Sequence, residues 1–412
     1  MYFYDTCSLL NNLGLIQKMN QRFIISSITI QELENIKTAS YKDDEIKYKA
    51  RRVVDWLKNA DFMVWRYLNG YDDILKEHHL EINNDTKICA CAYVAHISYD
   101  IFFVTEDILC QQFAKILQVP IINLSKDKEK YYGWIDANLS EDELAFFYAT
   151  QLNEFNGTIQ GYHMLPNQYL ILTQDNKTID EYKWTGDKLI KVPYFQLKTN
   201  LLGTIKPMAD DGYQRCALDS LLCNKLTVLR GHAGSGKSYL ALGYLCYALE
   251  KGIIDKIIIF CNPVAVRGAA KLGYYPGTRD SKLLDSQIGN FLSAKFGDKL
   301  IVEDLMNKNQ LLLLPMADVR GFDTTGMKAG IYITEAQNMT IDMMKLALQR
   351  IGDDCICILD GDSDTQVDVP IYSGINNGLD RVSEVFRGQD FYGEIELQYI
   401  HRSKIAELAE QM

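Results

Sequence analysis

Residues 226–238 read Leu-Thr-Val-Leu-Arg-Gly-His-Ala-Gly-Ser-Gly-Lys-Ser. The apolar run 226–229 predicts a buried strand, which turns at Gly231 and enters a helix at 236–238. A glycine, four residues and then Gly-Lys-Ser is the spacing of a phosphate-binding loop. Glycines allow backbone N–H groups to surround phosphate oxygens, and the following helix directs its positive end at the same point. The alternative is a glycine-rich turn with an exposed lysine.

This loop assigns roles to particular residues. Lys237 is expected to contact the β- and γ-phosphates of ATP, and the Ser238 hydroxyl is expected to bind Mg²⁺. Gln214 precedes a predicted helix over 217–222 and is placed to hydrogen-bond an adenine edge, although a solvated helix cap is equally compatible with the sequence. The predicted nucleotide-binding residues are therefore Gln214, Gly231, His232, Ala233, Gly234, Ser235, Gly236, Lys237 and Ser238.

The second half of the chain alternates strands and helices, which predicts a parallel sheet with helices on both faces. Further apolar strands are expected at 256–261, 311–314, 331–334 and 355–359. Glu335 follows one of them and is expected to orient and activate the attacking water. The predicted catalytic residues also include Asp362 and Gln366, as sensors of the γ-phosphate, and Arg381 or Arg402, as a source of positive charge from the same or a neighbouring subunit. A surface salt bridge is the alternative for either arginine.

Four acidic residues accompany predicted strands and helices in the first third of the chain. Strands are expected at 2–5, 23–28 and 101–105, and the acids are Asp5, Glu32, Asp85 and Asp107. Sites form at the carboxyl ends of parallel strands, and carboxylates there suit one or two Mg²⁺ or Mn²⁺ ions that hydrolyse a phosphodiester. The alternative is structural: Thr29-x-x-Glu32 matches a capping box, and the three aspartates are suitable helix caps. Periodicity leaves both interpretations open.

Residues 125–205 predict a linker and a small antiparallel β connector. Ser140 to Glu143 match a capping box, and strand and turn signals alternate from 168 to 192. Lys183, Trp184 and Tyr194 could contact a strand of nucleic acid. Packing of these aromatic residues in a small β core is the favoured interpretation.

The composition is that of a globular chain of two or three domains. Of its 412 residues, 47% are hydrophobic, and the formal net charge of −11 argues against a broad basic surface for nucleic acid. The ten cysteines are scattered, which favours a reducing compartment. The N-terminus lacks a basic region and an apolar segment, so no signal peptide and no membrane span are expected. These features predict a cytoplasmic protein.

Two family resemblances follow from these motifs. Residues 1–124 resemble a PIN domain, a family of metal-dependent ribonucleases, through Asp5-Thr6, Ile30 to Lys37, Asn84 to Ile88 and Val104 to Asp107. Residues 206–412 resemble the PhoH-like P-loop ATPases, relatives of superfamily 1 helicases. The matches there are Gly231 to Ser238, Leu272 to Gly277, Glu335 to Asn338, Leu348 to Gly352, Gly361-Asp362, Asn377 to Leu379 and Arg402-Ser403.

The resemblance implies an α/β chain with a PIN-like domain at 1–124, a β connector at 125–205 and a PhoH-like ATPase domain at 206–412. It implies the four metal-binding acids named above, with Glu34 competing for the place of Glu32. It also implies ATP-driven RNA unwinding coupled to RNA cleavage, often in a ring of subunits. The expected partners are partly single-stranded RNA and further copies of the chain, with a hexamer as one form of ring.

Two positions depart from the PhoH-like pattern. Thr334 stands where the family usually has an aspartate that supports Mg²⁺, so hydrolysis is expected to be slow or altered. Asp360 or Asp362 is a candidate replacement. The run from Gly361 to Gln366 carries one extra residue, which changes where Gln366 points.

Overall fold

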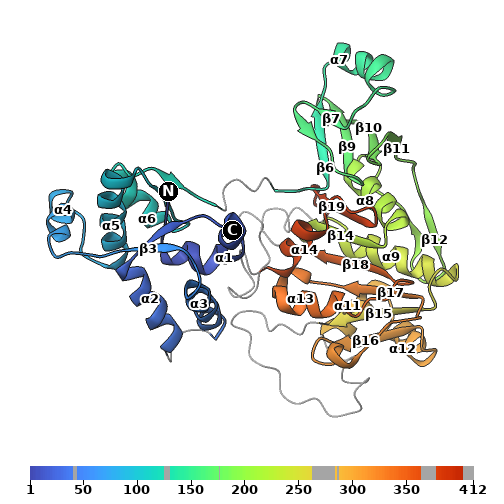
Figure 1. Cartoon of the computed structure of the whole chain (residues 1–412). Helices are drawn as coiled ribbons and strands as arrows, with labels where there is room; N and C mark the ends of the chain where they lie inside the picture. The colour runs from blue at the N-terminus through green and yellow to red at the C-terminus, as the bar shows by residue number, and fades with distance from the viewer. Residues whose placement is uncertain are drawn as a thin grey trace. The chain divides into compact units, whose positions relative to one another are not determined.

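The computed structural model describes residues 1–39, 44–124, 130–175, 177–261, 284, 287–362 and 377–401. The chain divides into two compact units, Met1–Lys130 and Tyr131–Met412 (Figure 1). Gln366, Arg402 and the motif at 272–277 lie outside the described residues. Within the described ranges, no helix is both long enough and apolar enough to cross a membrane.

The first unit is built on a five-stranded parallel sheet of order β3-β2-β1-β4-β5. Its strands are β1 (Tyr2–Tyr4), β2 (Phe23–Ser26), β3 (Phe62–Trp65), β4 (Phe102–Val104) and β5 (Ile121–Ile122). Its helices are α1 (Thr6–Met19), α2 (Ser27–Thr38), α3 (Asp44–Leu57), α4 (Tyr71–Glu77), α5 (Asn84–Tyr99) and α6 (Ile108–Ile116). The parallel sheet is confirmed, whereas β3 and β5 were not predicted.

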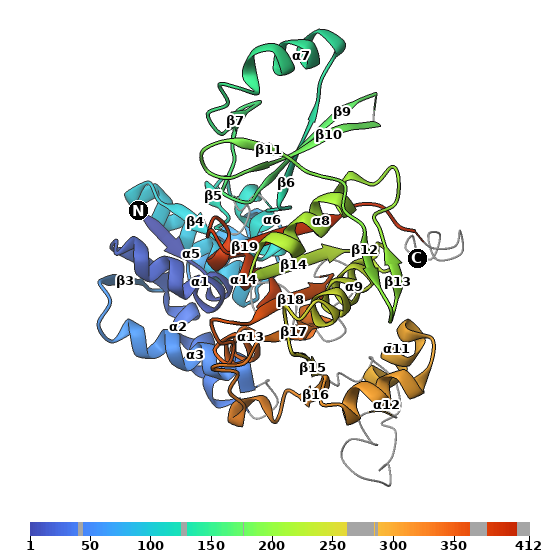
Figure 2. The same ribbon diagram turned by 90° about the vertical axis from the view of Figure 1, so that its right-hand side faces the viewer.

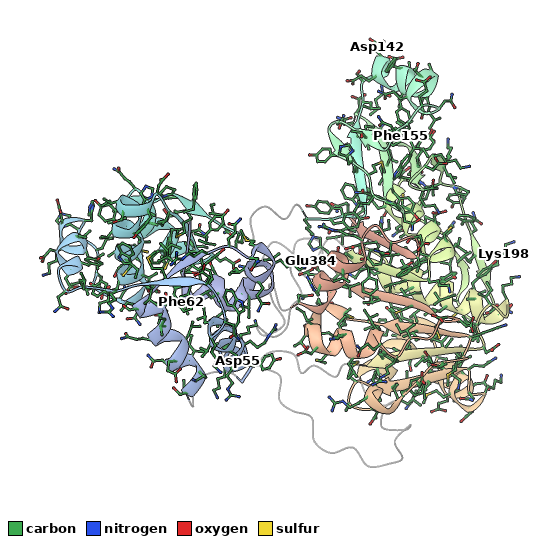
Figure 3. The ribbon with its side chains drawn as sticks, viewed as in Figure 1. Asp55, Phe62, Asp142, Phe155, Lys198 and Glu384 are labelled. Atoms are coloured by element: carbon green, nitrogen blue, oxygen red, sulfur yellow. The ribbon has the colours of Figure 1, made fainter. Side chains whose placement is uncertain are left out.

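Apolar side chains fill both faces of this sheet. Phe3 and Phe103 belong to the cluster on one face, and Tyr4 and Phe23 belong to the cluster on the other. The Phe23 ring stacks on that of Phe62 on the neighbouring strand, with ring centroids 5.7 Å apart. Phe62 is labelled in Figure 3. This alternation is what period-two strands with both faces covered by helices require.

The start of α2 differs from the predicted capping box. Ser26 is the N-cap, because its hydroxyl accepts a hydrogen bond from the Thr29 backbone N–H at 2.8 Å. The proposed pairing of Thr29 with Glu32 as cap and counter-cap is therefore wrong. The Glu32 side chain instead accepts a hydrogen bond from the Thr6 hydroxyl.

The second unit begins with a four-stranded sheet of order β11-β10-β9-β6. Its strands are β6 (Trp134–Asn138), β9 (Tyr169–Gln174), β10 (Lys177–Trp184) and β11 (Leu189–Lys191). The prediction of an antiparallel meander holds for β9 to β11, but β6 pairs with β9 in parallel, because the chain between them makes a long excursion. That excursion holds α7 (Glu141–Phe146), a π-helical turn (Phe147–Gln151) and the short hairpin β7 (Thr158–Ile159) and β8 (Tyr162–His163). The predicted capping box of Ser140 and Glu143 is present.

The core of this connector explains its aromatic residues. Trp184 is buried, and the Phe155 ring meets it edge-on at 5.3 Å between centroids (Figure 3). The Lys183 ammonium pairs with the Asp219 carboxylate at 2.9 Å. The packing interpretation is therefore confirmed for Trp184, whereas the ion pair of Lys183 was not predicted. Tyr194 is exposed.

The remainder of the second unit surrounds a six-stranded parallel sheet of order β16-β15-β17-β18-β14-β19 (Figure 2). Its strands are β14 (Leu226–Gly231), β15 (Lys256–Cys261), β16 (Leu311–Pro315), β17 (Ala329–Ile333), β18 (Ile356–Gly361) and β19 (Tyr392–Leu397). Strand β19 was not predicted. The described helices are α8 (Gly212–Cys223), α9 (Lys237–Glu250), α11 (Gln287–Phe296), α12 (Lys299–Asn307), α13 (Ile341–Leu348) and α14 (Gly378–Phe386). A separate hairpin of β12 (Leu197–Thr199) and β13 (Gly203–Ile205) packs on α9.

Helices cover both faces of the six-stranded sheet, as predicted. One apolar cluster contains residues of α8, α9, α11 and α12, and the other contains residues of α13 and α14. The order of the strands places β18 directly between β17 and β14. The residues that follow these three strands therefore meet at one edge of the sheet.

Candidate functional site

The phosphate loop lies between β14 and α9, as its spacing predicts. Gly231 and Gly236 have φ angles of +132° and +101°, a region that side chains disfavour. A Cβ atom on Gly231 would lie 2.5 Å from the Leu397 carbonyl oxygen, and one on Gly236 would lie 2.7 Å from Gln214 Nε2. Conformation and space thus both require glycine at these two positions.

Gln214 and Lys237 hold the two sides of this loop. The Lys237 ammonium donates hydrogen bonds to the Gly231 and His232 carbonyl oxygens, the latter at 2.9 Å. Gln214 is buried; its Nε2 donates to the Ser235 carbonyl oxygen and its Oε1 accepts from the Met208 N–H, both at 2.9 Å. Both ends of the Gln214 amide therefore support the backbone around the loop, and its contact with adenine stays a prediction.

His401 is a second support for the loop, and sequence reasoning missed it. Its backbone N–H donates to the Gly234 carbonyl oxygen at 3.0 Å, and its Nε2 lies 2.7 Å from an Asp211 carboxylate oxygen. Asp211 also caps α8 through the Gln214 N–H. No local pattern could have linked His401 to Asp211, because 190 residues separate them.

Asp360, at the end of β18, is a meeting point of the strand ends. Its Oδ2 accepts hydrogen bonds from the Ser238 hydroxyl at 3.0 Å and the Tyr332 hydroxyl at 2.7 Å. Its Oδ1 accepts the Glu335 backbone N–H at 3.2 Å. Burial, and then the Asp360 charge, raise the pKa of Tyr332 well above its usual value, so Tyr332 acts as a hydrogen-bond donor.

Glu335 follows β17 and takes a left-handed conformation, with φ at +52°. Its carboxylate accepts a hydrogen bond from Gln337 Nε2 at 2.7 Å. The Oε1 atom of Gln337 in turn accepts the Asp362 N–H at 3.2 Å, and an Asp362 carboxylate oxygen lies 3.2 Å from His232 Nδ1. The structure thus brings Glu335 and Asp362 together with the phosphate loop. Gln337 connects them, a role that its place in a sequence motif did not reveal.

Of the two candidate catalytic arginines, Arg381 and Arg402, only Arg381 lies within the described residues. Arg381 lies on α14 and forms a half-exposed salt bridge with Glu384 at 2.7 Å, as the structural alternative predicted. Arg230, which no motif indicated, is buried in β14 and pairs with Glu394 and Asp380 at 2.5 and 2.6 Å. These contacts join β14, β19 and α14. Arg230 therefore stabilises the sheet beneath the site.

The donor atoms near the phosphate loop suit a hard cation. The Ser238 hydroxyl and the Asp360 carboxylate are oxygen donors beside the N-terminus of α9, and Mg²⁺ prefers oxygen ligands. The oxygen donors at this edge of the sheet therefore fit a cation such as Mg²⁺. A bound Mg²⁺ would neutralise phosphate charge there.

The acidic cluster of the first unit comprises Asp5, Asp85 and Asp107. Asp5 is buried and caps α1, accepting the Ser8 N–H at 2.6 Å and the Thr105 hydroxyl at 2.5 Å. Asp107 caps α6 through the Leu109 N–H at 2.8 Å. The cap interpretation thus holds for these two residues. It is wrong for Asp85, because Asn83 caps α5.

The environment of the acidic cluster raises the pKa of two of its carboxylates. Burial raises the pKa of Asp5 to about 6, and the Asp107 charge contributes to this rise. Burial and the Asp107 charge likewise raise the pKa of Asp85. Burial is the main cause of both shifts and the Asp107 charge adds to it, a penalty on the charged carboxylates that a divalent cation would relieve. Among the described residues, however, no three histidine, cysteine or acidic side chains are gathered closely enough to hold a metal.

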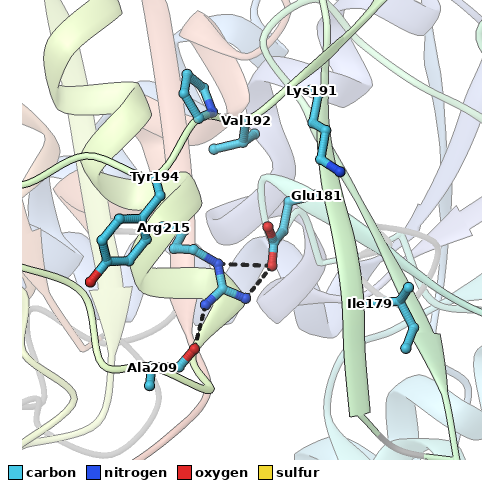
Figure 4. A pocket seen from close by; sticks show the side chains of 8 residues that line it. Ile179, Glu181, Lys191, Val192, Tyr194, Ala209 and Arg215 are labelled. Atoms are coloured by element: carbon cyan, nitrogen blue, oxygen red, sulfur yellow. Dashed lines mark hydrogen bonds and ion pairs between the residues drawn. The ribbon is translucent and has the colours of Figure 1, made fainter.

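A pocket of about 690 Å³ lies where the connector meets α8 (Figure 4). Arg215 lines it, pairs with Glu181 of β10 and donates to the Ala209 carbonyl oxygen at 2.7 Å. Tyr194 lies on the rim and is exposed. The ion pair fastens the connector to the helix that carries Gln214, which couples the two parts of this unit.

The chain is similar to known proteins over both units. Residues 204–412 match the family model described as PhoH-like protein, and residues 2–125 match a PIN domain model. Protein PhoH2 of Bacillus subtilis (strain 168) is 27% identical over 361 residues, which cover 81% of this chain and 79% of that protein.

Two further relatives match only about half of this chain. The PhoH-like protein of Bacillus subtilis (strain 168) is 33% identical over 45% of this chain and 56% of its own length. Protein PhoH2 of Thermobispora bispora is 30% identical over 48% of this chain and 45% of its own length. This chain thus spans about half the length of these two relatives. It belongs to the family of PhoH-like proteins and carries a PIN domain ahead of its PhoH domain.

Proposed function

We propose that this protein is an ATP-dependent RNA-processing enzyme. ATP hydrolysis in the second unit would drive unwinding or translocation of partly single-stranded RNA, and the PIN domain would cleave that RNA with Mg²⁺ or Mn²⁺. The observation that carries the proposal is the arrangement of the phosphate loop, Glu335 and Asp360 at one sheet edge, joined by hydrogen bonds. The PIN and PhoH families supply the coupling to RNA as an expectation.

The proposed hydrolysis uses the contacts of this edge. Water attacks the γ-phosphorus, and the bond from that phosphorus to the bridging oxygen of ADP breaks, so that ADP and phosphate leave. Glu335, oriented by Gln337, accepts the proton of the water. Lys237 and the N-terminus of α9 stabilise the negative charge on the phosphates. His232 and Asp362 lie at the same edge, where they would respond to the γ-phosphate.

The proposed cleavage uses the three acids of the acidic cluster together with Glu32. Asp5, Glu32, Asp85 and Asp107 would hold one or two divalent cations, which supply an activated water and stabilise the leaving oxygen. Thr105 fixes the orientation of Asp5. We further propose that the protein acts in the cytoplasm as a homo-oligomer, with a hexameric ring as the form to test by light scattering.

The decisive experiment is cleavage of an end-labelled, partly single-stranded RNA in Mg²⁺ or Mn²⁺, with and without ATP. We expect Asp5→Asn to abolish cleavage and Lys237→Ala to abolish both ATP turnover and its stimulation of cleavage. Asp187→Asn, an exposed acid in a turn of the connector, is the matched control. Cleavage and turnover that survive in both variants would contradict the proposal.

A second function is favoured by two observations. The described acids of the first unit do not converge into a group that could hold a metal, and Thr334 departs from the family pattern. We therefore propose as the alternative an ATP-gated RNA-binding module whose PIN domain is inactive. ATP binding without turnover, together with intact RNA in Mn²⁺, would favour it. Comparing turnover with RNA and with DNA separates both from a DNA-directed motor, since the 2′-hydroxyl distinguishes the two nucleic acids.

A further inference from the structure

The buried carboxylate of Asp360 lies on β18, the strand next to the one that leads into the phosphate loop. The PhoH-like pattern instead expects a metal-supporting acid one strand further away. That position is Thr334, which follows β17. The parallel register pairs Ile333 with Leu359, so Thr334 stands beside Asp360 of β18. Strand β18 is also the direct neighbour of β14, with Leu229 paired to Asp360. Asp360 therefore lies between the threonine and the strand that leads into the loop.

The contacts of Asp360 connect it to both halves of the proposed reaction. One carboxylate oxygen accepts the hydroxyl of Ser238, the residue expected to bind Mg²⁺. The other accepts the backbone N–H of Glu335, the proposed proton acceptor. A single carboxylate thus joins Ser238 to the backbone of Glu335. Asp360 is thus placed to set the distance between the cation and the attacking water.

The hydroxyl of Tyr332 holds the Asp360 carboxylate in place. The Tyr332 side chain is fully buried, and its hydroxyl donates to Asp360 Oδ2 at 2.7 Å. Asp360 is itself only 2% exposed, so its orientation is set by protein contacts rather than by water. A carboxylate held in this way can support a cation with little reorganisation.

We infer that Asp360 is the acid that positions Mg²⁺ in the ATP site, in place of an acid at position 334. The inference rests on the proposed ATPase function and adds a specific residue to it. It also changes the expected effect of Thr334. A carboxylate is still present at the phosphate loop, but it comes from β18 instead of β17, so Thr334 does not imply weak binding of Mg²⁺ and ATP.

The test measures the affinity of the full chain for a fluorescent, non-hydrolysable ATP analogue in EDTA and in Mg²⁺. The ratio of the two dissociation constants reports how strongly Mg²⁺ tightens nucleotide binding, without any turnover. For Asp360→Asn we expect this tightening to fall by about 10- to 100-fold, the usual effect of removing a group that supports a metal ligand, with affinity in EDTA retained. Asn keeps the shape of the side chain and one acceptor oxygen.

Two further variants make the result specific. Asp354→Asn changes an exposed acid just before β18, at the opposite end of that strand, and should leave the tightening unchanged. Tyr332→Phe keeps the Asp360 carboxylate but removes the hydroxyl that orients it, and should reduce the tightening by about 2- to 10-fold. Circular dichroism establishes that each variant is folded. If Asp360→Asn does not fold, the Mg²⁺ tightening measured for Tyr332→Phe tests the role of Asp360 instead.

The outcomes separate this inference from the proposed function. Full Mg²⁺ tightening in Asp360→Asn, or in Tyr332→Phe where only that variant folds, would overturn the role of Asp360. Loss of tightening in Thr334→Val but not in Asp360→Asn would overturn it as well and assign the cation to Thr334. If the wild-type protein does not bind the analogue, or if Lys237→Ala binds it equally well, the ATPase proposal itself fails.

Discussion

The two acidic edges of this protein are organised in opposite ways. At the edge of the six-stranded sheet, hydroxyl and amide groups separate the carboxylates: Ser238 and Tyr332 hydrogen-bond to Asp360, and Gln337 lies between Glu335 and Asp362. At the edge of the five-stranded sheet, Asp5 and Asp107 each cap a helix, and burial, with a smaller contribution from the Asp107 charge, raises the pKa of Asp5 to about 6.

This difference indicates how each site is assembled. The ATP edge is ordered by hydrogen bonds that the protein itself provides, so its geometry is set before a ligand binds. Asp5 and Asp107 of the first unit accept hydrogen bonds from the helices that they cap, and burial still raises the pKa of Asp5 and of Asp85, a penalty that a divalent cation would relieve. We therefore expect the first site to be sensitive to the loss of amide and hydroxyl groups and the second to be sensitive to the metal.

Among variants of the ATP edge that keep nucleotide binding, Glu335→Gln should have the largest effect. Loss of the proton acceptor should reduce ATP turnover by about 10²- to 10³-fold, because a positioned base is lost while the shape of the side chain is kept. Affinity for the fluorescent ATP analogue should be unchanged. Turnover is measured by phosphate release in the presence of RNA. Turnover within a few fold of wild type would remove Glu335 from its proposed role.

Asp5→Asn should affect the other edge alone. We expect metal-dependent RNA cleavage to fall by at least about 10- to 100-fold, while ATP turnover is retained. Asparagine is also a good N-cap, so α1 keeps its capping residue and the change tests the charge. Cleavage rates over a series of Mn²⁺ concentrations provide the measurement. A loss that extra Mn²⁺ does not alter, accompanied by a lower melting temperature, would indicate a structural role.

Gln337→Ala tests whether amide groups organise the ATP edge. Its Nε2 donates to a Glu335 carboxylate oxygen, and hydrogen bonds to charged groups contribute about 1.5–3 kcal/mol. We expect kcat to fall by about tenfold or more, with little change in KM, because the hydrogen bond that is lost orients the proposed proton acceptor Glu335. Gln337→Glu keeps the size but places a second negative charge beside Glu335, and it should be slower still. An unchanged kcat in both would argue that Glu335 is oriented in another way.

The smallest effect expected is stabilisation of the acidic cluster by metal. A tenfold excess of Mn²⁺ over its dissociation constant should stabilise the first unit by about 1.4 kcal/mol. Hydrogen exchange should therefore slow by up to about tenfold in peptides that cover the N-termini of α1 and α6, which Asp5 and Asp107 cap. The same peptides in Asp5→Asn should not respond. Equal protection in both proteins would place the ion elsewhere.

Much of this organisation was predictable from short stretches of sequence. The glycine spacing of the phosphate loop reflects φ angles and a closeness of approach that only glycine permits, so Gly231 and Gly236 are recognisable without a structure. The alternation of strands and helices predicted both parallel sheets. The short strands β3 and β5 and the parallel pairing of β6 were missed, because strand pairing over long separations leaves little local signal.

The sequence by itself determined which chemical groups stand after which strands: Lys237 and Ser238 after β14, Glu335 after β17 and the aspartates beside β18. It could not determine which of these groups touch. Only the order of the strands decided that Asp360, not residue 334, hydrogen-bonds to Ser238, because β18 is inserted between two strands that come earlier in the chain. Likewise, tertiary structure brought His401 to the phosphate loop from 167 residues away along the chain, counted from its backbone partner Gly234. Side-chain contacts of this kind depend on packing between distant elements, which local propensities do not encode.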